Sequence, residues 1–333
     1  MNRIQKIGII GSGKMGSDIF NYLSDYSYKL VWFNRNSEHS NMLHETFEKK
    51  LKRQLKHGII NQDIFELKNT FQITSKLNEL SDCDLVIETV IEDQNVKLAL
   101  FKSLENIVKP SCIIVSNSSS IIPSIYSQEL NRQNRIAGIH FFYPMAIKNV
   151  TEIIYSNQTD EVIKECIKLF LESINRFYIE QDETNAFILN RFLLEMQIKA
   201  FDLHKLHNID FKEIDEIAKK IIPDFGLFEV IDAVGHQTMY NSILNYSHMD
   251  VNKYKYNPLL ADLDSKLKSG FNYIELTDSL YSTTIKIEIG LQENILNTLK
   301  NYSQEIIASY SANFNINIYV LKKALNDFCG IMV

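Results

Sequence analysis

Cysteine is scarce in this chain, and its few copies are scattered. The four cysteines, Cys83, Cys112, Cys166 and Cys329, show neither CxxC spacing nor the grouping of a metal site. A disulfide framework or a structural zinc site needs cysteines at short, regular spacings. We therefore expect reduced thiols that pack in the protein interior, and we expect no bound metal.

Long apolar runs and an excess of positive charge are also missing. No segment contains the ~18 consecutive apolar residues that span a bilayer, and the first residues read as a strand rather than as a signal peptide. The formal net charge is -6, so no broad basic surface is available for nucleic acid. We expect a cytoplasmic protein without membrane or nucleic-acid partners.

The length and apolar content suit a protein with two hydrophobic cores. The 333 residues exceed the usual size of a single core, and 45% of them are hydrophobic. Apolar strands such as 84–90 and 112–116 alternate with helical segments such as 93–107, which predicts a doubly wound, parallel α/β sheet of Rossmann type over residues 1–181. Apolar residues then recur every three or four positions, which predicts an all-α domain over residues 182–333.

A glycine-rich turn follows the first apolar strand. The sequence there reads Gly11-Ser12-Gly13-Lys14-Met15-Gly16, and a helix is expected to begin near Ser17. In this motif the first glycine allows a tight turn, the second lets the backbone approach a pyrophosphate, and the third lets the helix pack on the strand. We expect Gly11, Gly13, Met15 and Gly16 to bind a dinucleotide.

The second strand ends without the acidic residue that usually binds the ribose of NAD. The apolar run 28–33 leads directly into Asn34 and Arg35. Asn34 does not repel a 2′-phosphate, and the guanidinium of Arg35 can bind one in a bidentate way. The sequence therefore predicts NAD or NADP as the cofactor and slightly favours NADP. Alternatively, Arg35 stacks on the adenine or points into solvent.

A histidine and a carboxylate occur in apolar surroundings near the middle of the chain. His140 lies in Gly138-Ile139-His140-Phe141-Phe142-Tyr143-Pro144, and Glu152 lies in Thr151-Glu152-Ile153-Ile154. A carboxylate on one imidazole nitrogen fixes the tautomer and stabilises the imidazolium that forms when the other nitrogen takes a proton. A buried histidine and an unrelated surface glutamate would give the same pattern. The dinucleotide motif upstream favours a catalytic pair.

Two further polar stretches have both a structural and a functional interpretation. Ser116-Asn117-Ser118-Ser119-Ser120 follows a strand, so its hydroxyls either cap a helix or bind a substrate oxygen. The cationic run 49–58, which includes Lys56, is either a solvated helix face or a site for a nucleotide phosphate or an acidic carrier protein.

Short sequence matches recur at a fixed offset in the carboxyl-terminal half. Ile188-Leu189-Asn190 recurs as Ile295-Leu296-Asn297, and Asn208-Ile209 recurs as Asn315-Ile316, each 107 residues later. These matches predict a degenerate repeat of about residues 185–240 and 290–333, although a chain rich in Asn and Ile also produces chance matches. The protein would be a homodimer or a pseudo-symmetric monomer that supplies internally what a dimer partner would supply.

Together these motifs resemble the 3-hydroxyacyl-CoA dehydrogenase family over residues 5–240. The similarity rests on GSGKMG, DLVIETVIEDQNVKLALF, SNSSS, RIAGIHFFYP with its downstream glutamate, NAFILNRFL and FGLFEVIDAVG, in the order of the family. The resemblance implies a Rossmann domain, a helical domain and a role in fatty acid metabolism. It also implies hydride transfer between C3 of an acyl thioester and a nicotinamide.

The resemblance assigns four catalytic residues, position by position. His140 would be the general base, and Glu152 would orient it and balance its charge. Ser119 would hydrogen-bond the reacting oxygen of the substrate, and Asn190 would do so from the helical domain.

The resemblance also assigns cofactor and substrate contacts. Glu92, Lys97 and Asn117 would line the cofactor pocket, and Lys56 lies near where the family binds carrier phosphates. Tyr143 replaces the usual asparagine beside the catalytic histidine, so we expect it to contact the substrate and to distinguish this protein's substrate from the usual one.

We predict an NAD(P)-dependent oxidoreductase that interconverts 3-hydroxyacyl and 3-oxoacyl thioesters, with an acyl-CoA or an acyl-carrier-protein as substrate. Departures from the family pattern, such as Asn185-Ala186 in place of Pro-Gly, are compatible with a specialised branch. The alternatives are a dehydrogenase of a free hydroxy acid or sugar acid, a hydroxyacyl-carrier-protein dehydrogenase of a biosynthetic pathway, and a non-catalytic dinucleotide-binding protein.

Overall fold

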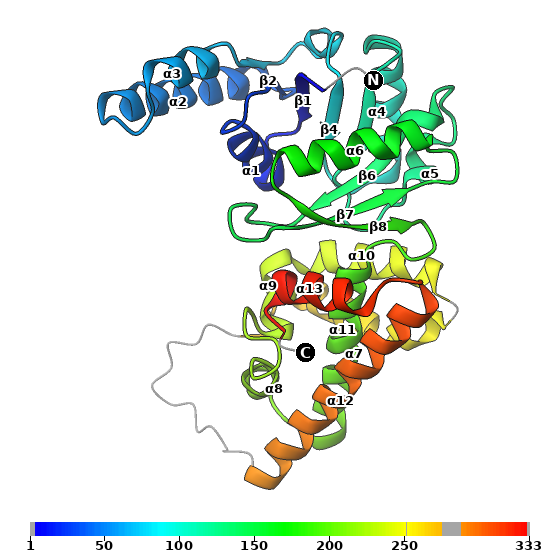
Figure 1. Cartoon of the computed structure of the whole chain (residues 1–333). Helices are drawn as coiled ribbons and strands as arrows, with labels where there is room; N and C mark the ends of the chain where they lie inside the picture. The colour runs from blue at the N-terminus through cyan, green and yellow to red at the C-terminus, as the bar shows by residue number, and fades with distance from the viewer. Residues whose placement is uncertain (1–3, 251, 275–287, 332–333) are drawn as a thin grey trace. The chain divides into compact units, whose positions relative to one another are not determined.

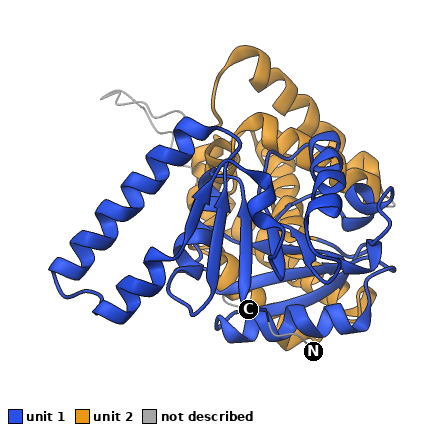
Figure 2. Cartoon of the chain, turned by 90° about the horizontal axis from the view of Figure 1, so that it is seen from above, with its two compact units in different colours: residues 1–186 blue, residues 187–333 orange. Residues whose placement is uncertain are grey.

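The computed structural model describes residues 4–250, 252–274 and 288–331 (Figure 1). The chain divides into two compact units, residues 1–186 and 187–333 (Figure 2). The first unit is an α/β domain, and the described part of the second is helical. The domain boundary that the sequence places near Gln181 falls inside the last strand of the first unit, Phe177–Asp182.

The first unit is built on an eight-stranded sheet with the order β3-β2-β1-β4-β5-β6-β7-β8 (Figure 1). Its strands are β1 Lys6–Ile10, β2 Lys29–Phe33, β3 Gln72–Thr74, β4 Leu85–Glu88, β5 Ile113–Ser116, β6 Ile136–Phe141, β7 Val150–Tyr155 and β8 Phe177–Asp182. This confirms the doubly wound fold of Rossmann type. The sheet is mixed rather than wholly parallel, because β7 runs antiparallel to β6. The connection 142–149 is too short for the crossover that parallel strands need.

Helices cover both faces of this sheet. They are α1 Lys14–Leu23, α2 Ser37–Lys56, α3 Gln62–Asn69, α4 Gln94–Ile107, α5 Pro123–Ser127 and α6 Glu161–Ser173. Successive strand residues point to opposite faces. Trp32 and Ile87 therefore share a buried cluster with α1 and α6, whereas Val31 and Val86 share another with α4 and α5. Burial on both faces explains why these strands read as continuous apolar runs.

The first helix begins earlier than the sequence pattern predicts. α1 starts at Lys14 with Gly13 as its N-cap, whereas the expected start was near Ser17. The residues of the glycine-rich motif therefore form the first helical turn themselves. Their backbone N–H groups are among those that an α-helix leaves without intrahelical partners.

The described part of the second unit is all helical, as expected. Its helices are α7 Ile188–His207, α8 Phe211–Ala218, α9 Leu227–Val234, α10 His236–Met249, α11 Asn257–Ser269, α12 Ile289–Asn313 and α13 Ile318–Cys329. The apolar residues Phe192, Met196 and Leu203, spaced by about one or two turns, are all buried in α7. None of the helices in the described ranges is long and apolar enough to cross a membrane.

A buried aspartate holds the turn between α8 and α9. The carboxylate of Asp215 accepts hydrogen bonds from the backbone N–H groups of Phe228 (3.0 Å) and Glu229 (2.9 Å). A Cβ on Gly226 would come 2.3 Å from Asp215 Oδ2, so this approach needs glycine. Burial raises the pKa of Asp215 to about 6, although the backbone donors oppose the shift.

The raised pKa of Asp215 predicts a pH dependence of stability. Between about pH 4 and pH 6 the carboxyl group of Asp215 is protonated in the folded protein but has lost its proton in the unfolded chain. The free energy of unfolding therefore falls as the pH rises through this window. At ~1.4 kcal/mol for each pKa unit, the loss is about 3 kcal/mol. Asp215→Asn should remove this loss, whereas the exposed Asp202→Asn in α7 should not. Urea unfolding of the three proteins at pH 4 and pH 6.5 tests this, and equal pH slopes in all three would contradict it.

Candidate active site

Most of the predicted site residues lie at one edge of the sheet. The carboxyl ends of the parallel strands β1, β4, β5 and β6 meet there, where doubly wound folds bind their ligands. The glycine-rich turn follows β1, Glu92 follows β4, the serine cluster follows β5, and His140 lies near the end of β6. The fold thus gathers four motifs that are far apart in the sequence.

The turn after β1 has the shape that a dinucleotide pyrophosphate requires. Gly11 has a φ of +108°, which L side chains rarely adopt, and a Cβ on Gly16 would come 2.2 Å from the carbonyl oxygen of Gly11. A Cβ on Gly13 would meet nothing within 4 Å, so the space beside this residue is open. No side chain caps α1, which leaves its first N–H groups for an anion. The residues present therefore fit a bound dinucleotide.

The end of β2 offers an amide where NAD enzymes usually have a carboxylate. Asn34 Nδ2 donates to Ser12 Oγ (2.7 Å), and Asn34 Oδ1 accepts from the backbone N–H of Asn36 (3.0 Å). Asn34 is buried by these contacts, whereas Arg35 is exposed. Asn34 therefore ties the glycine-rich turn to β2, and Arg35 presents a cation beside it.

A buried ion pair lies behind the serine cluster. Lys97 exposes 1% of its side chain and donates to both carboxylate oxygens of Glu88 (2.8 and 2.9 Å). Glu88 also accepts from Ser116 Oγ (2.5 Å), and Lys97 lies 3.5 Å from Glu92. Although the sequence suggested Lys97 as a cofactor contact, its burial argues against direct contact. Lys97 can act on a ligand through Glu92.

Glu92 organises the turn that carries the serines. Its Oε1 accepts from the hydroxyls of Ser118 (2.5 Å) and Ser120 (2.9 Å) and from the backbone N–H groups of Ser119 (3.1 Å) and Ser120 (3.0 Å). Burial raises the pKa of Glu92, but Lys97 and the serine donors outweigh this effect, so the pKa lies below its usual value. A charged Glu92 therefore fixes the backbone of Ser119.

His140 and Glu152 lie directly opposite each other in antiparallel strands. The register of β6 and β7 pairs the two residues, and Glu152 Oε2 accepts from His140 Nδ1 at 2.8 Å. Both side chains are buried, and the imidazole packs on the ring of Phe142 at 4.3 Å between centroids. Asn117 Oδ1 accepts from the backbone N–H of Phe141 (2.9 Å), which joins the end of β5 to β6 beside His140. Glu152 is therefore not an unrelated surface residue.

A third residue, Gln181, completes this arrangement and was missed by sequence reasoning. Gln181 Nε2 donates to Glu152 Oε1 at 2.9 Å, so the two oxygens of Glu152 face different partners. Gln181 is buried, and its own Oε1 has no hydrogen-bond partner within the described ranges. The period of two in β8, which puts Gln181 on the same buried face as Ile179, is the signal that could have revealed it.

The segment after His140 reaches across to the glycine-rich turn. Lys14 Nζ lies 4.0 Å from the ring centroid of Tyr143, which is 48% exposed. The backbone N–H of Met145 donates to Asp18 in α1 (2.7 Å), and the buried Arg176 donates to the carbonyl of Met145 (2.8 Å). Tyr143 thus contacts the phosphate-binding motif, and the substrate contact that the sequence suggests for it stays a prediction.

Two predicted site residues, Asn190 and Lys56, do not lie at this edge of the first unit's sheet. Asn190 belongs to α7 in the second unit, where its Nδ2 donates to the hydroxyl of Tyr246 at 3.4 Å. Lys56 is the exposed last residue of α2, which packs beside β3 at the border of the sheet. Their proposed roles therefore depend on their positions in the sequence motifs.

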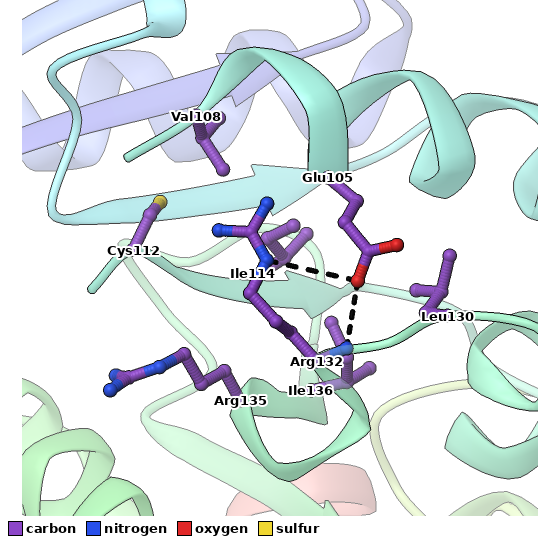
Figure 3. Close-up of a pocket in the computed structure, with 8 residues that line it drawn as sticks. All are labelled: Glu105, Val108, Cys112, Ile114, Leu130, Arg132, Arg135 and Ile136. Atoms are coloured by element: carbon purple, nitrogen blue, oxygen red, sulfur yellow. Dashed lines mark hydrogen bonds and ion pairs between the residues drawn. The ribbon is translucent and has the colours of Figure 1, made fainter. Parts of the chain in front are cut away.

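A small cavity of the first unit lies at the opposite edge of the sheet (Figure 3). It is lined by Glu105, Val108, Cys112, Ile114, Leu130, Arg132, Arg135 and Ile136. Cys112 precedes β5 and Ile136 begins β6, so the cavity lies at the amino ends of strands whose carboxyl ends carry the site. No cluster of three or more His, Cys, Asp or Glu residues suited to a metal ion occurs in the part of the chain that the structure describes.

Both units of the chain match models of known protein families. Residues 6–184 match the family model described as 3-hydroxyacyl-CoA dehydrogenase, NAD binding domain. Residues 187–271 match the model described as 3-hydroxyacyl-CoA dehydrogenase, C-terminal domain. The second copy of the expected repeat lies beyond the matched residues.

Individual relatives agree with these matches. The chain is 30% identical over 260 residues to a 3-hydroxybutyryl-CoA dehydrogenase of Bradyrhizobium diazoefficiens, covering 77% of this chain and 87% of that protein. It is 26% identical over 256 residues to the human mitochondrial hydroxyacyl-coenzyme A dehydrogenase, covering 74% of this chain and 81% of that protein.

The fold is also similar to solved structures. The crystal structure of (S)-3-hydroxybutyryl-CoA dehydrogenase from Ralstonia eutropha gives a TM-score of 0.72 at 23% identity, covering 83% of this chain and 100% of that chain. A similarity at this identity shows a shared fold. The family matches to both units go further: the chain belongs to the 3-hydroxyacyl-CoA dehydrogenase family.

Proposed function

We propose that the protein interconverts 3-hydroxyacyl and 3-oxoacyl thioesters with a nicotinamide dinucleotide. The observation that carries this proposal is the buried pair of His140 and Glu152 at the edge of a dinucleotide-binding sheet. The names of the relatives, which include 3-hydroxybutyryl-CoA dehydrogenase, support an acyl-CoA substrate. A bound nicotinamide would supply the hydride acceptor.

His140 is proposed as the general base. Glu152 engages its Nδ1, so Nε2 would take the proton of the 3-hydroxyl group while the hydrogen on C3 leaves as hydride. The alcohol thereby becomes a ketone, and the imidazolium that forms lies against a carboxylate. In the reverse direction the imidazolium returns the proton to the reduced oxygen.

Ser119 and Asn190 are proposed to hydrogen-bond the reacting oxygen. Ser119 lies in the turn that Glu92 fixes, so its position is set before a ligand binds. Asn190 takes the same role by its place in the motif NAFILNRFL, and Tyr246 supports its amide. The loss of one such preset donor typically costs about 2.7 to 4 kcal/mol of transition-state stabilisation.

The cofactor would bind along the glycine-rich turn, with Glu92 and Asn117 near its nicotinamide end and Lys97 acting through Glu92. NADP is favoured over NAD, because Asn34 carries no negative charge and the exposed Arg35 stands beside it. Tyr143, through its contact with Lys14, would shape the pyrophosphate side of the site. The exposed Lys56 is proposed to bind a phosphate of the acyl carrier.

The proposed base can be tested by replacing His140. His140→Gln should lower kcat for the reduction of acetoacetyl-CoA by roughly 10²- to 10⁴-fold, because His140 would act as general acid in this direction and general acid–base catalysis typically contributes this much. The exposed His44→Gln in α2 is the matched control and should keep wild-type activity. Cofactor binding, followed by fluorescence, should be unchanged in both variants. Equal kcat in wild type and His140→Gln would refute the assignment.

The contact between Gln181 and Glu152 predicts a smaller effect. Gln181→Leu removes a hydrogen bond to a charged group, worth about 1.5–3 kcal/mol, so Glu152 orients the imidazole less firmly. We expect kcat to fall roughly tenfold with little change in KM. Gln158→Leu, at an exposed position, should leave both constants unchanged. If Gln181→Leu instead raises KM roughly tenfold and leaves kcat unchanged, Gln181 does not act by orienting Glu152.

The role of Arg35 predicts a change in cofactor preference. Arg35→Ala should raise the KM for NADPH roughly tenfold or more and leave the KM for NADH nearly unchanged, because a charged hydrogen bond to the 2′-phosphate is lost. Lys29→Ala removes an exposed cation from the other end of β2 and should change neither constant. If the wild type uses NADH as well as or better than NADPH, and Arg35→Ala does not change this preference, Arg35 does not contact the 2′-phosphate.

A further inference from the structure

The repeat at an offset of 107 residues recurs in the backbone of the second unit. Asn208 at the end of α7 has a φ of 50°, and Asn315 after α12 has a φ of 51°. Positive φ values are uncommon in residues other than glycine. Within the described ranges only two other such residues occur, Asn175 and Phe187. The same rare conformation thus follows both long helices at equivalent positions.

Side-chain hydrogen bonds at the two turns also match. His204 Nδ1 donates to the carbonyl of Ile209 at 2.5 Å, and Ser311 Oγ donates to the carbonyl of Ile316 at 2.7 Å. Each donor and each acceptor is shifted by the same offset. A different side chain therefore closes the same loop in each copy.

The N-caps of the helices that follow agree as well. Asp210 Oδ1 accepts from the N–H of Lys212 at 2.8 Å before α8, and Asn317 Oδ1 accepts from the N–H of Tyr319 at 2.9 Å before α13. Caps of this kind satisfy one of the free donors of a helix start. The short connection between the helices is therefore the same structure in both copies.

Burial follows the offset along both helix pairs. Each of the following pairs consists of two buried residues: Ile188 and Ile295, Phe192 and Leu299, Met196 and Ser303, Ala200 and Ile307, Leu203 and Tyr310, Ile214 and Leu321, and Ala218 and Leu325. These pairs include residues of different size and polarity, such as Met196 and Ser303. Geometry is therefore retained more closely than sequence.

The two copies pack on each other in a reciprocal way. α7 packs on α12, α8 packs on α12, and α13 packs on α7 (Figure 1). The hydroxyl of Tyr302 donates to Glu195 at 3.0 Å, and these two residues occupy equivalent positions of the repeat, because they are separated by 107 positions. Arg191, near the start of α7, lies over the ring of Phe314 just after α12, so the helices run in opposite directions. When two copies are related by a twofold axis, equivalent residues contact each other only close to that axis. The contact between Glu195 and Tyr302 therefore indicates a twofold axis near these residues.

We propose that the helical hairpin α12–α13 is a second copy of α7–α8 and serves as a built-in partner subunit. The internal twofold axis passes near Glu195 and Tyr302, and the face of α7 through which two chains could pair is covered by α12 of the same chain. The protein is therefore a monomer. The second copy carries Thr298 in place of Arg191, and its Asn297 is exposed, so it is a packing module. This proposal does not depend on the proposed reaction.

Two measurements test the built-in partner. Light scattering of the unaltered chain should give the mass of one chain, 38.7 kDa, across a wide range of dilution. In a refolded equal mixture of unlabelled and ¹⁵N-labelled chains, a lysine-reactive cross-linker should join residues 187–222 to residues 288–331 only within chains of one isotope. A dimeric mass, or links between the two isotopes, would overturn the proposal.

A directed cross-link sharpens the test at the axis. Glu195→Cys combined with Tyr302→Cys, in a Cys166→Ser background that removes the most accessible native thiol, should give one intramolecular product with a short bis-maleimide. Each single variant should give none. Circular dichroism confirms that the variants fold, and the lysine experiment on the unaltered chain decides the question if they do not. Products that link two chains through these cysteines would overturn the proposal.

Discussion

The reversal of the chain between β6 and β7 is the constraint on which the candidate site depends. A parallel β7 would require a crossover, and the register that pairs His140 with Glu152 would not exist. Directly opposed residues of antiparallel strands bring their side chains close together on one face. β8 then adds Gln181 from the far side of β7. The proposed proton-transfer group is therefore carried by three strands of a sheet rather than by mobile loops.

Buried charge supports the serine turn, which is proposed to bind the reacting oxygen. Glu88 and Lys97 are removed from water, which costs solvation energy, and removing one partner of such a pair typically costs about 3–5 kcal/mol. Lys97 also lies beside Glu92, and Glu92 fixes the serine turn through four hydrogen bonds. A chain of contacts therefore runs from a fully enclosed lysine to the backbone of Ser119. These contacts matter more for the position of Ser119 than for the free energy of unfolding.

Local patterns could be predicted from the sequence, and long-range pairings could not. The strand, turn and helix around Gly11 are signalled within a few residues, so the dinucleotide site and the Rossmann fold were predictable. The contacts of Glu152 depend on strand register, and a slip of one residue would turn it away from His140. Lys97 reads as a surface cation in sequence, and only packing shows that it is enclosed. Tyr143 meets Lys14 because a loop crosses between motifs far apart in the chain.

The matched turns after α7 and α12 show which features the two proposed copies have in common. Asn208 and Asn315 both have a left-handed backbone, while the side chain that bonds the following carbonyl is a histidine in one turn and a serine in the other. What persists is a set of backbone requirements, each of which several residue types can meet. Duplicated helical pairs should therefore be sought by comparing turns and caps at a constant offset, even where the aligned letters no longer agree.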